Sequence, residues 1–97
     1  MISGYKSSMN VKLDAPFEIQ LKSPGTSGFE WEPDFNLTAF TLLESRQVPN
    51  LKKMGASGKV IFRFRPLSRG DYAIRFALMR PWEDEVAEHL EVSLHVD

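Results

Sequence analysis

Apolar and polar residues alternate along several stretches of this sequence, and no window of ten residues or more follows the 3.6-residue period of a helix. The clearest stretch is 71–79, in which every second position is occupied by Tyr72, Ile74, Phe76 and Leu78. A period of two places one side of an extended strand on a core and leaves the other side to solvent. The chain is therefore predicted to consist of β-strands.

The same alternation recurs along the chain, with turn-forming residues between the stretches. It covers 9–13, 17–22, 29–31, 60–65 and 90–97, and a less regular extended stretch covers 35–48. Pro33 is expected to end the strand at 29–31, because proline lacks a ladder donor. Short strands separated by turns, in a chain of this length, predict an all-β fold, an immunoglobulin-like antiparallel β-sandwich of about seven or eight strands.

The length of the chain limits it to one domain. Its 97 residues are enough to bury roughly three-fifths of the unfolded surface. An apolar content of 42% with 26% charged residues is typical of a folded, soluble protein. Residues 1–8 are polar and unpatterned, so we expect a loose lead-in followed by a single domain over 9–97.

Charge and cysteine content exclude several classes of function. A formal charge of -1 provides no basic surface for nucleic acid, and no stretch reaches the length of a membrane span. Without cysteine there is neither a disulfide nor thiol chemistry. We expect a monomer with no nucleic-acid or membrane partner. Met1 begins a polar segment without a signal-peptide core, which leaves the cytoplasm and an exported form with its signal removed as alternatives.

The sequence offers few groups for catalysis or metal binding. His89 lies near Glu85 and Glu88, but one histidine with scattered carboxylates lacks the ligand spacing of metal sites. His95 falls on the outward side of the last strand and is expected to be a solvated sheet residue. No Ser-His-Asp set can be nominated from the spacing. We therefore expect no enzyme, no cofactor and no metal site.

Three loops are rich in glycine, proline and aromatic residues, and they cover 23–28, 49–58 and 80–88. If successive strands run antiparallel, their connections alternate between the two ends of a sandwich. Counting along the chain then places these three loops together at one end. The short turns at 33–34 and 66–70 are placed at the other end.

The two tryptophans differ in their sequence context. Trp31 is in phase with Phe29 on a strand and is predicted to belong to the core. Trp82 follows Pro81 outside any alternating stretch, so it either folds back over the rim of the sandwich or serves as a binding anchor. Tryptophan and arginine are enriched at interface hot spots, which favours the anchor for Trp82 beside Arg80.

The three loops carry motifs that occur together in one family. Residues 23–31 read Ser-Pro-Gly-Thr-Ser-Gly-Phe-Glu-Trp, residues 55–58 read Gly-Ala-Ser-Gly, and residues 80–82 read Arg-Pro-Trp. The first resembles an Asn-Pro-Thr-Thr-Gly-aromatic-x-Trp loop, the second resembles Gly-x-Gly-Gly, and the third is identical to Arg-Pro-Trp/Phe. These are the motifs of the chagasin-like inhibitors of papain-family cysteine peptidases, and the resemblance covers nearly the whole chain.

The first two motifs depart from the family pattern. Without a gap, Asn-Pro-Thr-Thr becomes Pro24-Gly25-Thr26-Ser27, whereas Ser23-Pro24 matches Asn-Pro only if Gly25 is an insertion. The family asparagine is absent in both alignments. Ser57 stands where the family has glycine in the second motif.

The resemblance implies an immunoglobulin-like sandwich whose three loops form a wedge for a protease cleft. In the family, the first loop enters the catalytic centre and the other two flank it. The implied function is reversible inhibition of a papain-like cysteine peptidase by loops 23–28, 49–58 and 80–88. The residues implied to bind the peptidase are Pro24, Gly25, Thr26, Ser27, Gly28, Phe29, Gly55, Ala56, Ser57, Gly58, Arg80, Pro81 and Trp82.

Two other functions compete with inhibition. An immunoglobulin-like protein-binding or adhesion module without peptidase inhibition is supported by the altered first loop. A small enzyme is disfavoured, because no catalytic set can be named from the sequence.

Overall fold

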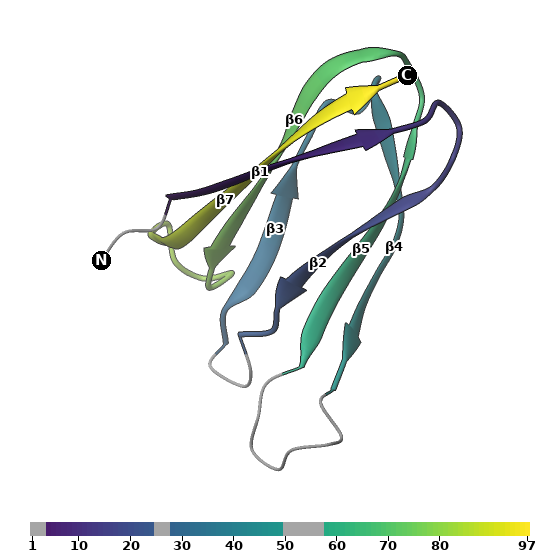
Figure 1. Ribbon diagram of the computed structural model, residues 1–97. Coiled ribbons are helices and arrows are strands. Elements are labelled where there is room, and N and C mark those ends of the chain that lie inside the picture. Colours follow the sequence, from purple (N-terminus) through teal and green to yellow (C-terminus); the bar gives the residue numbers. More distant parts are fainter. Residues whose placement is uncertain (1–3, 25–27, 50–57) are drawn as a thin grey trace.

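Two β-sheets face each other in the computed structural model, which describes residues 4–24, 28–49 and 58–97, without the side chains of 4–6 (Figure 1). The described residues form seven strands and no helix. The strands are β1 (Gly4–Val11), β2 (Phe17–Lys22), β3 (Glu30–Asp34), β4 (Phe40–Val48), β5 (Lys59–Pro66), β6 (Gly70–Met79) and β7 (Val86–Val96). The predicted all-β, immunoglobulin-like sandwich is confirmed.

One sheet has the order β1-β7-β6-β3 and the other has the order β2-β5-β4. All neighbouring strands are antiparallel except β1 and β7, which run parallel. This pair corrects the expectation of a uniformly antiparallel fold. After β1 the chain crosses to β2 in the other sheet, so no hairpin fixes the direction of β1 against its neighbour.

The first strand begins earlier than the sequence predicts. Residues 4–8, expected to be a loose lead-in, pair with β7 in a register that runs from Gly4 opposite His89 to Val11 opposite Val96. The alternation of apolar and polar residues starts only at Met9 and Val11, because Ser7 and Ser8 before them are both polar. Backbone hydrogen bonds to a sheet edge can extend a strand without an apolar pattern, which is why periodicity missed this part.

The strand β3 also continues past the residue expected to end it. Pro33 lies opposite Phe76 and Asp34 lies opposite Arg75, both within the β3–β6 ladder. Because β3 is at the edge of its sheet, it has a neighbour on one side only. Proline is tolerated on edge strands, where its missing N–H removes no ladder bond on the open side.

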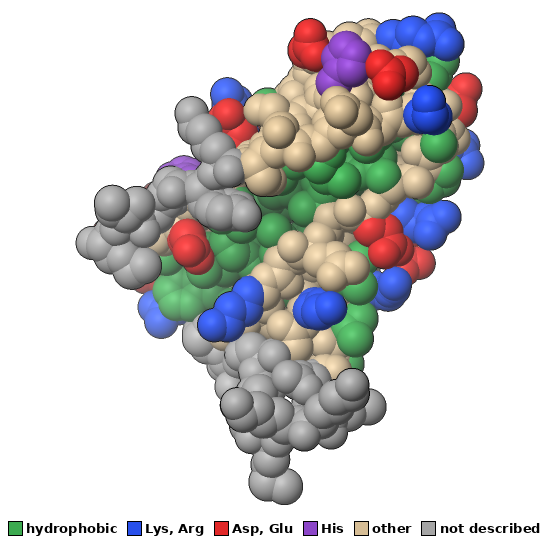
Figure 2. All heavy atoms as spheres, in the orientation of Figure 1, with side chains coloured by type: hydrophobic (Ala, Val, Ile, Leu, Met, Phe, Trp, Pro, Cys, Tyr) green, Lys and Arg blue, Asp and Glu red, His purple; other side chains and the backbone are tan. Residues whose placement is uncertain are grey.

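The core lies between the two sheets and follows the alternation of the sequence. Its buried residues are Val11, Ile19, Leu21, Trp31, Ala39, Phe40, Val60, Phe62, Phe64, Ile74, Phe76, Val92, Leu94 and Val96. Figure 2 shows apolar side chains in the seam between the sheets, with charged side chains on either side. The predicted core position of Trp31 is confirmed.

An aromatic cluster fills one part of this core. Phe64 is fully buried, and its ring stacks on Phe17 with centroids 5.8 Å apart. The rings of Phe35 and Phe40 meet Phe64 edge-on at centroid distances of 5.1 and 6.3 Å. Offset and edge-on contacts of this kind add to the free energy gained by burying the rings.

The strand ends divide between two poles, as the alternation of loops predicts. At one pole the stems of loops 23–28, 49–58 and 80–88 meet, because β2, β4 and β6 end there and β3, β5 and β7 begin there (Figure 1). At the opposite pole the remaining turns are joined by backbone hydrogen bonds. The Asp14 N–H donates to the Pro66 carbonyl and the Leu67 N–H donates to the Ala39 carbonyl.

His95 lies on the outer side of β7, as the sequence predicts, between two carboxylates. Its Nδ1 is 2.6 Å from Oδ1 of Asp71, and its Nε2 is 2.9 Å from Oδ1 of Asp97. The hydrogen bond to Asp71 and the charge of that carboxylate raise the pKa of His95 above its usual 6.5, with a further contribution from Asp97. The folded state therefore favours the imidazolium more strongly than the unfolded chain does.

Replacing Phe64 by alanine is expected to lower the free energy of unfolding by about 3–5 kcal/mol, because the cluster loses its central ring and a cavity remains. Urea unfolding measures the change. Leu37→Ala is the control, since Leu37 is 76% exposed and its truncation is expected to cost less than about 0.5 kcal/mol. Equal losses in the two variants would contradict the assigned core.

Stability is expected to depend on pH through His95. Because its folded pKa is raised, its contribution is complete below the unfolded pKa of 6.5 and is lost as pH rises through the folded value. The difference in unfolding free energy between wild type and His95→Gln should therefore shrink as the pH rises above 6.5. A pH-independent difference would count against the His95 pair.

Candidate functional site

Hydrogen bonds at the loop pole tie the first loop to both sheets. The indole Nε1–H of Trp31 on β3 donates to the Lys22 carbonyl at the end of β2, over 3.0 Å. The Ser23 N–H donates to the carbonyl of Gly58, also over 3.0 Å. The stem of loop 23–28 is therefore bonded to the strand that follows it and to the stem of loop 49–58.

Gly58 lies where the stem of the second loop closes. A Cβ at this position would collide with the backbone carbonyl oxygen of Val48 and approach Cα of Pro49 to 2.7 Å. Backbone atoms cannot move aside as a flexible side chain can. Only glycine therefore allows the two strands of this hairpin to approach each other so closely at the base of the loop.

The first and third loops are in direct contact through Trp82 and Gly28. Gly28 has a φ of +87°, and a Cβ built there would lie 2.9 Å from Cη2 of Trp82. The indole therefore lies against a backbone that only glycine leaves open. Trp82 is still 71% exposed, so most of its surface is available to a partner. Trp82 therefore packs on the rim of the sandwich, as one of its two alternatives predicts, and its role as a binding anchor stays a prediction.

Arg80 makes a second contact between the same two loops. Its Cζ lies 4.4 Å from the centroid of the Phe29 ring, which is a cation–π distance. Its Nη1 donates to Oε1 of Glu83 over 3.1 Å. Phe29 is half-buried, and so are Arg80 and Glu83. The guanidinium is thus held by its own loop on one side and by the first loop on the other.

The structure brings together the described members of the site predicted from the sequence. Gly28 and Phe29 of the first loop meet Arg80 and Trp82 of the third, and Gly58 is bonded to Ser23. The predicted residues at 25–27 and 55–57 lie outside the described residues. Pro81 is exposed between its two neighbours in the motif.

A model of the chagasin family of peptidase inhibitors, I42, matches residues 10–96. The chain belongs to the chagasin family. This is a family of protease inhibitors and not of enzymes, in agreement with the expectation from the sequence.

Known proteins resemble the chain in sequence and in structure. Chagasin of Trypanosoma cruzi is 30% identical over 82 residues, which cover 78% of this chain and 74% of chagasin. The structure of EhICP2, a cysteine protease inhibitor from Entamoeba histolytica, matches with a TM-score of 0.80 at 18% identity, over 99% of this chain and 95% of EhICP2. PbICP-C, solved in complex with falcipain-2, matches with a TM-score of 0.74 at 10% identity, over 99% and 91%. The two structures share the fold.

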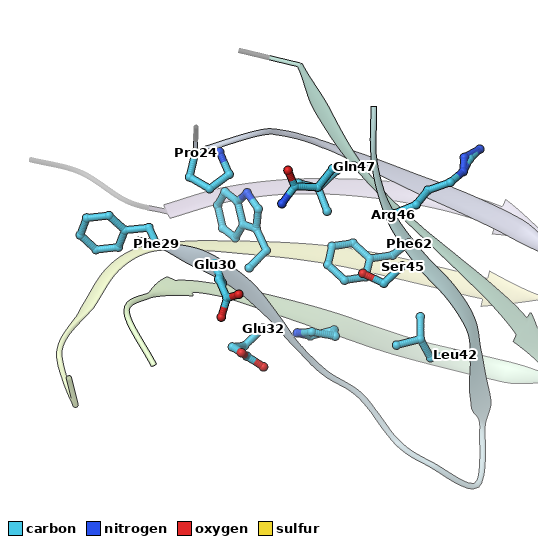
Figure 3. A pocket seen from close by; sticks show the side chains of 12 residues that line it. Pro24, Phe29, Glu30, Glu32, Leu42, Ser45, Arg46, Gln47 and Phe62 are labelled. Carbon is cyan, nitrogen blue, oxygen red and sulfur yellow. The ribbon is translucent and has the colours of Figure 1, made fainter. Parts of the chain in front are cut away.

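A groove runs beneath this end of the chagasin-family fold, between the open edges β3 and β4 (Figure 3). Its volume is about 400 Å³. Pro24 and Phe29 line the end nearest the loops, and the lining includes Trp31 and Phe62 from the core. The lining also includes the polar side chains of Glu30, Arg46 and Gln47, so the first loop borders a recess of mixed polarity.

Sequence reasoning missed Glu83 as a member of this site. It lies within loop 80–88 but outside the Arg-Pro-Trp motif, yet its carboxylate fixes the arginine of that motif. The spacing of three residues between Arg80 and Glu83 is the only signal that could have suggested it. Among the described residues, no group of three His, Cys, Asp or Glu side chains could hold a metal ion. No helix in the described part of the chain could cross a membrane.

Gly28→Ala is expected to lower the free energy of unfolding by about 1 kcal/mol or more, because alanine is strained at positive φ. It should also displace Trp82, whose indole N–H resonance would shift in an NMR spectrum while that of Trp31 stays in place. Gly70→Ala is the control, with a φ of +134° at the opposite pole. It should lose stability without moving the Trp82 resonance. An unmoved Trp82 resonance in Gly28→Ala would contradict the packing described above.

Proposed function

We propose that the chain is a reversible inhibitor of papain-like cysteine peptidases that inserts loops 23–28, 49–58 and 80–88 into the active-site cleft. Membership of the chagasin family supports this function, as does the relative PbICP-C, which was solved with falcipain-2 bound. The stems of the three loops lie at one pole, which is the arrangement that a three-part wedge requires.

One observation carries the proposal. Trp82 packs on Gly28 and Arg80 packs on Phe29, so the first and third family motifs form one continuous surface. Two loops that touch in the free protein present their side chains in a fixed relation to each other. A rigid surface of this kind fits a preformed protease cleft better than three independent loops would.

Inhibition of this type needs no chemistry from the inhibitor. It needs a loop that fills the cleft without offering a peptide bond in the geometry for thiolate attack. Pro24 fixes its own φ, and Gly28 adopts a φ of +87° that other residues resist, so both restrict the path of the first loop. Because the loop stems are already ordered, less conformational entropy is lost on binding.

In this proposal Trp82 is the anchor on one wall of the cleft. It is a large side chain, 71% exposed and held in place from below, and tryptophan is enriched among the residues that dominate binding energy. Thr26, Ser27 and Gly28 would lie against the catalytic Cys-His pair. Residues 55–58 would contact the opposite wall. A standard interface of roughly 1,600 Å² is consistent with three loops.

The direct test is titration of papain with the purified protein while hydrolysis of a fluorogenic dipeptide substrate is followed. Reversible loss of activity, with the inhibitor recovered uncut, is the expected result. A cathepsin L-like enzyme serves as a second target. No inhibition of either enzyme at micromolar concentration would overturn the proposal and favour the immunoglobulin-like binding module without peptidase inhibition.

Trp82→Ala is expected to weaken inhibition by more than about 1 kcal/mol, which is roughly a fivefold rise in Ki. Its unfolding free energy should stay close to that of the wild type, because Trp82 is mostly exposed. Leu37→Ala removes another exposed side chain, in the turn at the opposite pole, and is expected to leave Ki unchanged. An unaltered Ki in Trp82→Ala would remove Trp82 from the interface.

A further inference from the structure

We infer that Glu83 is a positioning residue for peptidase binding, which acts by holding the Arg80 guanidinium on the ring of Phe29 and so joins the third loop to the first. The inference rests on the proposed function, because it assigns Glu83 a role in that same surface. Glu83 lies outside the three sequence motifs.

The guanidinium of Arg80 is restrained from two directions. The Phe29 ring lies below its Cζ at 4.4 Å, and the carboxylate of Glu83 accepts a hydrogen bond from Nη1 over 3.1 Å. A ring contact alone allows the planar group to slide and rotate over the ring. A charged acceptor beside Nη1 restricts this motion, because guanidinium–carboxylate hydrogen bonds are directional.

The backbone places the carboxylate where this contact needs it. The Glu83 N–H donates to the Arg80 carbonyl over 3.0 Å, so the chain turns back on itself across Pro81 and Trp82. Arg80 and Glu83, the two ends of this turn, are thus joined by two hydrogen bonds, one between backbone groups and one between side chains. The position of Trp82 inside this turn, and its packing on Gly28, depend on the same two ends.

The ion pair has little effect on overall stability, which separates its role from a structural one. The side chains of Arg80 and Glu83 are 37% and 39% exposed, and pairs this accessible contribute little to folding. Arg75 and Glu91 form a comparable pair, with Nε and Oε1 3.0 Å apart, between β6 and β7. Glu91→Gln therefore provides a matched control, because it breaks the same kind of contact away from the loop motifs.

The first measurement is the Ki for papain. Glu83→Gln is expected to raise Ki by roughly two- to fivefold, as for loss of one accessible ion pair. Glu83→Asp should recover part of the loss, and Glu91→Gln should leave Ki unchanged. In an Arg80→Ala background, Glu83→Gln should have no further effect, because Glu83 acts through Arg80. A full effect of Glu83→Gln in that background would mean that Glu83 contacts the peptidase directly, and would overturn the inference.

The second measurement is made on the free protein and needs no peptidase. Protons of the Arg80 side chain that lie over the Phe29 ring are shifted upfield by its ring current. Phe29→Leu should abolish this shift, Glu83→Gln should reduce it, and Glu91→Gln should preserve it. A shift unaffected by Glu83→Gln would overturn the positioning role. If the wild type inhibits no papain-like peptidase, the proposed function fails, and the role of Glu83 in inhibition fails with it. The ring-current shift would still report whether Glu83 holds the Arg80 side chain on the Phe29 ring.

Discussion

The buried indole of Trp31 is the constraint on which the loop pole depends. Its rings fill the core between the sheets, and its N–H needs an acceptor that the apolar surroundings do not supply. The Lys22 carbonyl meets that need, so the end of β2 in one sheet is bonded to β3 in the other. This single hydrogen bond fixes the span that the first loop must cross. Trp31 also lines the groove at the open edge of the sandwich, beside the same stem.

Much of the fold could be predicted from alternation, because burial on one side of a strand leaves a period of two in the sequence. The inward positions of β5, β6 and β7 follow that rule. Two features could not be predicted in this way. The start of β1 depends on backbone pairing with β7, which leaves no apolar pattern, and the passage of Pro33 through β3 depends on which strand is at the edge. Edge position is a property of the whole sheet, so no local sequence signal encodes it.

The candidate site likewise has parts that a local sequence pattern predicts and parts that depend on the folded arrangement. Gly28, Phe29, Arg80 and Trp82 could be named from motifs, because each motif occupies a continuous stretch. Their mutual contacts could not, since these depend on two loops more than fifty residues apart meeting at one pole. Glu83 shows the same limit at short range. Its carboxylate is one of several between residues 83 and 91, and only the turn across Pro81 and Trp82 selects it as the partner of Arg80.

The parallel pairing of β1 with β7 has a consequence for how the protein reaches this state. The pair joins the first described residues of the chain to the last, so its contacts have nearly the greatest sequence separation that the chain allows. Closing such a large loop is entropically unfavourable, and folds dominated by distant contacts form slowly. The sheet β2-β5-β4 needs only residues 17–66, so it can assemble before the C-terminal strand is available. During synthesis, both strands that bound the second loop can therefore pair before the loop that carries Arg80 and Trp82 has a strand to close it.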